Sequence, residues 1–154
     1  MPAFSPNGIR ELPPHANEPI KSYAPGSPER TSLQARLKAM ESECPDIPVV
    51  VGGKEIRTGE TAKATSPHKH GHVTATYHKA TADDVRNAIT ASRAAWKEWS
   101  EWSWEERAAV FLKAADLLAG PWRDTINAST MLGQSKTVFQ SEIDAACEMV
   151  DFWR

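Results

Sequence analysis

The apolar residues of this chain recur every three or four positions over most of its length, which is the spacing of one face of an α-helix. The spacing predicts helices over residues 27–43, 81–100, 103–119 and 121–130. It is most regular near the end of the chain, where five apolar residues are spaced four, three, four and three: Phe139, Ile143, Ala146, Val150 and Trp153. The pattern therefore predicts a mostly helical chain.

Local signals at the expected helix ends agree with this prediction. Thr81 with Asp84, and Ser103 with Glu106, have the spacing of a capping box, in which a hydroxyl and a carboxylate satisfy free amides at a helix start. For the last helix, Ser135 is the expected N-cap, because serine is favoured there. Gly133 is the expected break before it, because glycine adopts a positive φ at little cost.

Two stretches favour strands over helices. Residues 47–57 combine three consecutive valines with Gly52-Gly53, which is typical of a β-hairpin with a tight turn. Residues 66–72 are interpreted as a loop that leads into a short strand at 73–77. Together with the helices, these strands predict an α+β chain that is mostly helical and has its β-hairpin near the N-terminus.

Composition and charge exclude several classes of function. The chain has 154 residues, a net charge of −2 and a pI of about 6.2. This length corresponds to one domain or part of one, and the charge gives no basic surface for nucleic acid. No apolar run approaches the roughly 20 residues that span a membrane. Cys44 and Cys147 lie far apart and are both expected to be reduced.

Three histidines alternate along the sequence at His68, His70 and His72. Alternate residues of an extended segment share a face, so a metal site is one interpretation. A structural zinc site normally needs four ligands, and no cysteine or histidine pair stands nearby. We therefore predict no metal site here, and metal analysis of the purified protein would test the alternative of a small metal protein.

The last predicted helix carries four acidic residues, Glu142, Asp144, Glu148 and Asp151, outside its apolar stripe. Acidic residues on a helix usually form a solvated face, because buried unpaired carboxylates are rare. The sharper interpretation is that one of them, held at the edge of the stripe, faces a substrate ammonium group. From the residues alone, either interpretation stands for each of the four.

Several segments, in order, resemble the NAD-dependent aldehyde dehydrogenase family, and more narrowly its Δ1-pyrroline-5-carboxylate dehydrogenase branch. The resemblance covers residues 17–154, which is the opening part of a family whose chains are several times longer. The matching segments are NEPI (17–20), GSPER (26–30), SP (66–67), HGH (70–72), FLKAAD (111–116), GP (120–121), TMLGQSKTV (130–138) and EIDAACEMVDF (142–152).

The resemblance implies an α/β parent fold with a Rossmann-type coenzyme domain. Residues 46–154 would be the opening part of that domain, incomplete at its C-terminal end, and residues 17–45 an N-terminal helical arm. Residues 1–16, which are interrupted by proline and glycine, are predicted to be a flexible leader. The helical pattern continues to Arg154 without a stop signal, so we expect the chain to be the front end of a longer protein.

The resemblance also implies an activity, the oxidation of L-glutamate γ-semialdehyde to L-glutamate with NAD in proline catabolism. The nucleophile, the general base and the coenzyme contacts of this family would lie beyond residue 154. No glycine-rich phosphate loop occurs in the chain, and Cys147, inside a helical run, is expected to be a structural thiol. We therefore expect this chain alone to bind no NAD and to be inactive.

One role of the family can be placed on a residue of this chain. In the branch that the chain resembles, a glutamate on this helix lies near the α-amino group of the substrate, and EIDAACEMVDF places it at Glu148, ahead of Glu142. A carboxylate at that point would favour the ammonium of the semialdehyde. Glu148 is therefore the predicted substrate-binding residue.

The resemblance further implies a homo-oligomer when full-length and a mitochondrial matrix location. No membrane partner is expected, because the chain lacks a long apolar run. The first 16 residues carry only Arg10 as a basic residue and also Glu11, so they do not form a clear transit peptide. The alternative hypothesis is a free-standing α+β interaction or regulatory module without catalysis. Such a module would need a closed core of its own.

Overall fold

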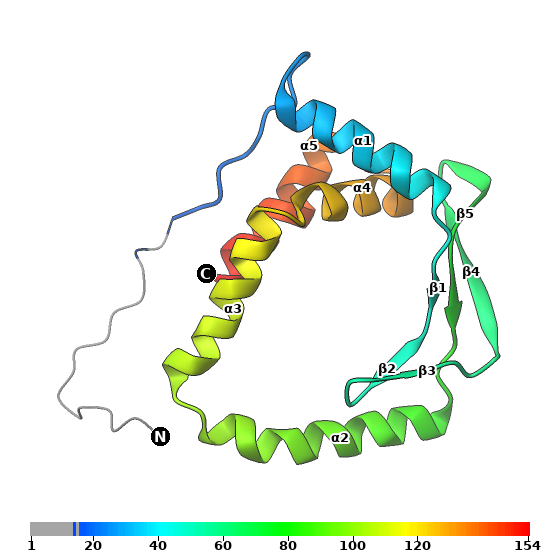
Figure 1. Ribbon diagram of the computed structural model, residues 1–154, viewed down its shortest axis with the longest axis vertical. Helices are drawn as coiled ribbons and strands as arrows, with labels where there is room; N and C mark the ends of the chain where they lie inside the picture. The colour runs from blue at the N-terminus through cyan, green and yellow to red at the C-terminus, as the bar shows by residue number, and fades with distance from the viewer. Residues whose placement is uncertain (1–13, 15) are drawn as a thin grey trace.

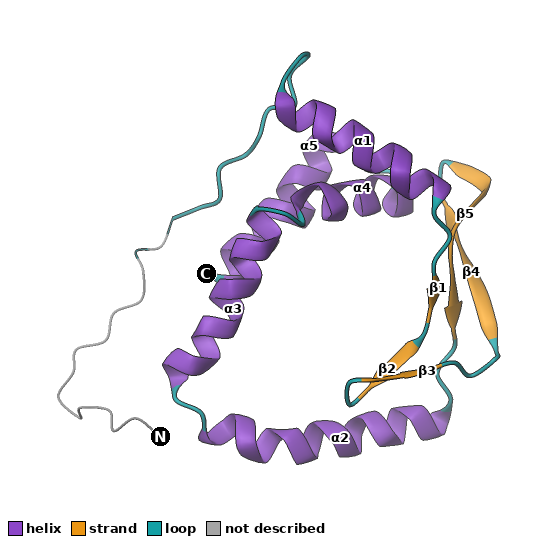
Figure 2. Ribbon diagram, viewed as in Figure 1, coloured by secondary structure: helices purple, strands orange, loops and turns teal. Residues whose placement is uncertain are grey.

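The computed structural model describes residues 14 and 16–154 of the chain (Figure 1). Most of the predicted leader, residues 1–13 and 15, lies outside the described residues. Helices dominate, and the strands gather at one side of the molecule (Figure 2). In chain order, the elements are α1 (Pro28–Ser42), β1 (Asp46–Ile47), β2 (Val49–Val51), β3 (Lys54–Ile56), β4 (Thr61–Ser66), β5 (Lys69–His78), α2 (Ala82–Glu101), α3 (Trp104–Ala119), α4 (Arg123–Gln134), α5 (Val138–Ser141), a π-helix (Glu142–Cys147) and α6 (Glu148–Trp153).

The strands form two small sheets. β2 and β3 pair antiparallel, and Gly52 and Gly53 at their turn have φ of +56° and +75°, as predicted for a tight hairpin. In the second sheet β5 lies between β4, which is antiparallel to it, and β1, which is parallel to it. Ile47, expected in the hairpin, belongs to β1 instead.

The predicted loop at residues 66–72 is wrong for most of its length. β4 ends at Ser66 and β5 begins at Lys69, so only a two-residue turn separates them. β4 was not predicted, because its sequence TAKATS is small and polar and gives no apolar alternation strong enough to recognise. β4 is held in the sheet by backbone pairing with β5, and its own side chains contribute little to its position.

The helices pack in two pairs, each with its own apolar cluster. α1 lies beside α4 (Figure 1), and Leu33 and Ala128 are buried between them together with Tyr23. α3 lies beside α6, where Ala115 and Leu118 pack against Val150. The two clusters are joined by α4 and the π-helix, so this junction is where the described residues bury most.

α2 runs along the opposite edge of the molecule (Figure 1), and it contacts the hairpin strand β2. The capping box of Thr81 and Asp84 starts it as predicted. Its apolar stripe is not buried in this chain, because Val85, Ile89 and Trp96 are all exposed, Trp96 by 68%. The periodic apolar stripe is present, but among the described residues little covers it.

The last helical segment begins at a different residue from the one predicted. Gly133 lies inside α4, and the left-handed residue that ends that helix is Ser135, with φ of +59°. Thr137 is the N-cap of α5 and forms a capping box with Gln140. From α5 to α6 the helix is continuous, but residues 142–147 widen into a π-helix.

In the described residues, no helix is both long and apolar enough to cross a lipid bilayer.

The hairpin turn gives the first testable expectation. Gly53→Ala should lower the free energy of unfolding by about 1–2 kcal/mol. At φ +75° the Cβ atom of an alanine comes too close to the backbone, which destabilises the folded state. Gly71→Ala is the matched control, since Gly71 also has no atom near its would-be Cβ but lies in β5 without a positive φ. The midpoint of urea unfolding measures both. Equal midpoints would contradict the assigned turn.

Candidate functional site

Residues at the junction of α4 and the π-helix form a buried polar cluster. Arg123, at the first position of α4, is 1% exposed, and Glu142, at the first position of the π-helix, is fully buried. The Nη2 and Nε atoms of Arg123 both donate to the carboxylate of Glu142, with Nε 3.2 Å from each oxygen. This geometry is a charge-assisted fork, the stronger class of ion pair.

The segment before α1 completes this ion pair. We call residues 18–23 the arm segment. Its Glu18 accepts from Nη1 of Arg123 at 2.5 Å, and the carbonyl of Pro19 accepts from Nη2 at 2.7 Å. The same Glu18 also pairs with Arg154 at 2.8 Å. The guanidinium is thus enclosed by groups from both ends of the described chain.

Glu142 accepts three further hydrogen bonds inside this cluster. The amide of Lys21, the hydroxyl of Tyr23 and the side-chain amide of Asn127 each donate to it at 2.8 Å. Asn127 also donates to the Tyr23 hydroxyl at 3.0 Å. A buried carboxylate is tolerated only when its oxygens are satisfied in this way.

These contacts fix the protonation states of the cluster. Burial alone would raise the pKa of Glu142, but the hydrogen bonds from Arg123, Lys21, Tyr23 and Asn127 outweigh it and lower that pKa to about 2. The pKa of Tyr23 is raised by burial and by its bond to the Glu142 carboxylate. The cluster therefore holds a carboxylate, a guanidinium and a neutral phenol.

The π-helix determines which residues share the buried face with Glu142. In a π-helix the hydrogen bonds join residues five apart, and the amide of Glu148 donates to the carbonyl of Ile143 in this way. Glu142 and Cys147, also five apart, therefore lie on one face, with the Cys147 sulfur 3.9 Å from the carboxylate and 3.3 Å from Nη2 of Arg123. Burial, and then the charge of Glu142, raises the pKa of Cys147 to about 11. Such a thiol is protonated and buried, as a structural cysteine is.

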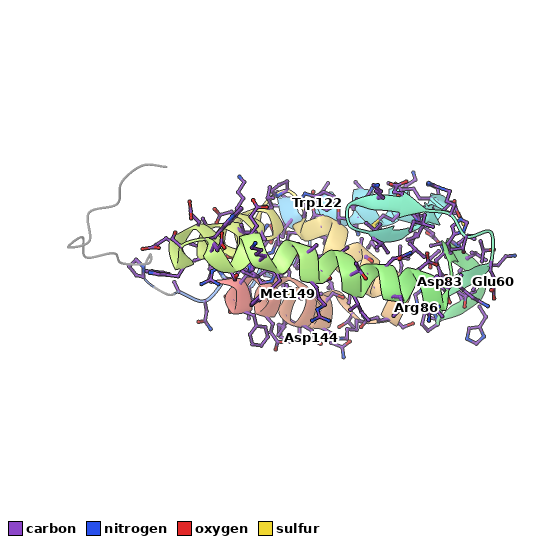
Figure 3. The ribbon with its side chains drawn as sticks, turned by 90° about the horizontal axis from the view of Figure 1, so that it is seen from below. Glu60, Asp83, Arg86, Trp122, Asp144 and Met149 are labelled. Atoms are coloured by element: carbon purple, nitrogen blue, oxygen red, sulfur yellow. The ribbon has the colours of Figure 1, made fainter. Side chains whose placement is uncertain are left out.

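The four acids of this helix have different environments. Glu142 is buried against Arg123, Asp144 pairs with Lys136 at 2.6 Å, and Asp151 accepts from the amide of Glu18 at 2.7 Å. Glu148 is exposed, and within residues 14 and 16–154 its side chain has no hydrogen-bond or ion-pair partner. Asp144, at the edge of the molecule in Figure 3, and Met149, which neighbours Glu148, are also exposed. The expectation that these acids are solvated is thus wrong for Glu142, which is buried.

The alternating histidines are not brought together as a metal site. In the described part of the chain, no group of three or more histidine, cysteine or acidic side chains could hold a metal ion. His68 instead lies 2.8 Å from the hydroxyl of Ser135 and 3.2 Å from that of Ser66. These bonds attach the β4–β5 turn to the end of α4.

The described residues also do not form a binding site for the phosphates of a dinucleotide. Such a site needs a strand that enters a helix through a glycine-rich turn. Here β5 enters α2 through Lys79, Ala80 and Thr81, and Thr81 already caps the helix. Among the acids of the last helix, Glu148 is the one whose side chain is exposed and has no partner in the described residues.

Sequence reasoning missed Arg123, the residue on which this cluster depends. Its signal is the helical spacing of α4: Arg123 lies four residues before Asn127, and both face Glu142. An arginine on the inner face of a predicted helix requires a buried acid, because an unpaired buried charge is too costly. The sequence does not say which acid it is.

Removing the arginine should destabilise the protein strongly. Arg123→Met leaves Glu142 without its cation and leaves Glu18 with Arg154 alone. Breaking a buried pair costs about 3–5 kcal/mol. The matched control is Arg86→Met, because Arg86 forms an exposed pair with Asp83 on α2 (Figure 3) and such pairs contribute little. The urea midpoint of the protein that carries this segment measures both. Similar midpoints for the two variants would show that the buried pair is not stabilising.

The lowered pKa of Glu142 also predicts a dependence on pH. The carboxylate binds its proton at about pH 2 in the folded state instead of at its ordinary 4.5. Its stabilisation is therefore present above pH 4.5 and is lost as the pH falls from 4.5 towards 2. Urea midpoints across this window should fall less steeply for Glu142→Gln than for the unchanged protein. Parallel curves would mean that Glu142 has an ordinary pKa.

A profile of the aldehyde dehydrogenase family matches residues 55–154. The Δ1-pyrroline-5-carboxylate dehydrogenase of Agaricus bisporus is 46% identical over 145 residues, and the mitochondrial human enzyme of that name is 48% identical over 139. These matches cover 94% and 90% of this chain but 27% and 25% of the relatives. The chain thus spans about a quarter of their length.

A solved structure agrees. The Δ1-pyrroline-5-carboxylate dehydrogenase of Mycobacterium tuberculosis, in a crystal structure with bound NAD, superposes with a TM-score of 0.93 at 48% identity, over 96% of this chain and 28% of that one. The predicted α+β arrangement, as part of an aldehyde dehydrogenase fold, is thereby confirmed. By sequence and by structure, this chain belongs to the aldehyde dehydrogenase family.

Proposed function

We propose that this chain is the opening part of an NAD-dependent aldehyde dehydrogenase that oxidises L-glutamate γ-semialdehyde to L-glutamate. The support is that relatives 46–48% identical to this chain are named Δ1-pyrroline-5-carboxylate dehydrogenases, in a fungus, a mammal and a bacterium. Because the chain spans about a quarter of these proteins, the reaction belongs to a longer protein. The proposed role of this segment is to bind the substrate.

Glu148 is the proposed contact to the substrate α-ammonium. The observation that carries this assignment is the difference among the four acids of the helix: Glu142, Asp144 and Asp151 have partners within the chain, and Glu148 has none. A carboxylate held on an ordered helix and not neutralised by the protein is suited to a cationic ligand. The amino group of glutamate semialdehyde is such a ligand.

The chemical steps are proposed to use residues outside this chain. Cys147 has a pKa of about 11 and contacts Glu142, so it is unsuited to attack an aldehyde as a thiolate. NAD, which the Mycobacterium tuberculosis enzyme binds, is proposed to bind the part of the longer protein that follows. A homo-oligomer, and a mitochondrial location like that in the name of the human relative, are part of the same proposal.

The exposed apolar faces favour this proposal over a free-standing interaction module. Besides the stripe of α2, Phe139 is 64% and Phe152 is 82% exposed, and Phe111 and Phe152 line a surface hollow of about 350 Å³ between α3 and α6. Soluble monomers rarely leave several large apolar side chains together in solvent. The remainder of an aldehyde dehydrogenase would cover them.

The decisive variant is Glu148→Ala in a full-length enzyme that carries this segment. We expect kcat/KM for glutamate semialdehyde to fall about 10-fold to 100-fold, the contribution of one charge-assisted hydrogen bond. The analogue 5-oxopentanoate, which lacks the amino group, should be oxidised with unchanged kcat/KM. Asp144→Ala is the control on the same helix, because its carboxylate already pairs with Lys136. Unchanged kinetics for Glu148→Ala would disprove the substrate role.

A further inference from the structure

Glu142, the acid of the buried ion pair, and the exposed Glu148 lie on one continuous helix, at the start of the π-helix and directly after its end. An α-helix turns by about 100° per residue, so a turn that accommodates one extra residue shifts every later side chain by about that angle. Here the extra residue falls between Glu142, which starts the π-helix, and Glu148, which follows it. The π-helix therefore determines the side of the helix on which Glu148 lies.

Arg123 contacts both ends of this π-helix. Its Nη2 atom donates to Glu142 at the start and lies 3.3 Å from the sulfur of Cys147 at the end. Without the extra residue, Cys147 would be rotated away from Glu142, and one guanidinium would not reach both. The ion pair thus favours the widened turn over a regular α-helix.

The residue after Cys147 is Glu148, and its amide makes the last hydrogen bond of the π-helix, to Ile143. The backbone of Glu148 is therefore fixed by the turn that Arg123 holds, while its side chain remains exposed and without a partner in the described residues. The buried pair is closed to solvent, so a ligand in solution does not reach it. It acts on Glu148 only through the helix.

We propose that Arg123 and Glu142 are positioning residues for substrate selection, because they hold the π-helix that directs the Glu148 carboxylate towards the substrate ammonium. This inference rests on the proposed function of Glu148. It extends that function to two residues that no substrate contacts, and to the arm segment, whose Lys21 amide and Tyr23 hydroxyl bind the same Glu142 carboxylate. Substrate selection at Glu148 thus depends on a cluster on the buried side of its helix.

The test is Glu142→Gln in the full-length enzyme, alone and combined with Glu148→Ala. The readout is the ratio of kcat/KM for glutamate semialdehyde to that for 5-oxopentanoate. We expect Glu142→Gln to lower this ratio about 3-fold to 10-fold, and to have no further effect on it when Glu148 is already alanine, as coupled residues behave. A purely structural loss would lower both substrates alike and leave the ratio unchanged.

Two further variants keep the test decisive. Tyr23→Phe removes one hydrogen bond from Glu142 and leaves the ion pair, so it should lower the ratio in the same direction by a smaller factor even if Glu142→Gln does not fold. Asp144→Asn lies within the π-helix but outside the buried cluster, and it should leave the ratio unchanged.

The outcomes separate this inference from the function on which it rests. If Glu148→Ala leaves the ratio unchanged, the substrate role of Glu148 is wrong, and the positioning role is wrong with it. If Glu148→Ala lowers the ratio but Glu142→Gln and Tyr23→Phe do not, only the positioning role is wrong. An equal decrease from Glu142→Gln in the presence and absence of the Glu148 carboxylate would also overturn it.

Discussion

The arrangement of this chain depends on the ion pair between Arg123 and Glu142. Both groups are almost completely removed from solvent, and a charge in that position is stable only if its own polar atoms are hydrogen-bonded. The matching groups come from the arm segment, from α4 and from the π-helix, so satisfying one guanidinium and one carboxylate fixes three separate parts of the chain. The apolar clusters on either side then pack against a junction that is already defined.

Much of the fold could be predicted from the sequence wherever its cause is local. The capping boxes that begin at Thr81 and Ser103, and the glycine pair of the hairpin, each act over a few residues. β4 could not be predicted, because its order comes from pairing with β5 and its own side chains carry little signal. The apolar spacing correctly predicted that α2 is a helix, but it does not show whether the apolar side is covered, and the elements around α2 leave it exposed.

The site was predictable only in part, for the same reason. Glu142 and Glu148 are both glutamates on one helix, and nothing in their spacing says that one is buried and the other exposed. The difference comes from partners as far away as Lys21 and Tyr23, and from a π-helix for which the sequence has no recognised signal. The assignment of Glu148 came from the family resemblance, and the structure adds that this acid is the one without a partner in the described chain. Its role in substrate binding stays a prediction.

The contact between the arm segment and Glu142 has a consequence for the synthesis of the protein. The amide of Lys21 lies 121 residues before the carboxylate that it binds. At about 5–20 residues per second, the ribosome needs roughly 6–24 seconds to make that partner after the arm itself. During this interval the arm segment has no partner to bind, so it stays undocked on the nascent chain until the later helix has been made.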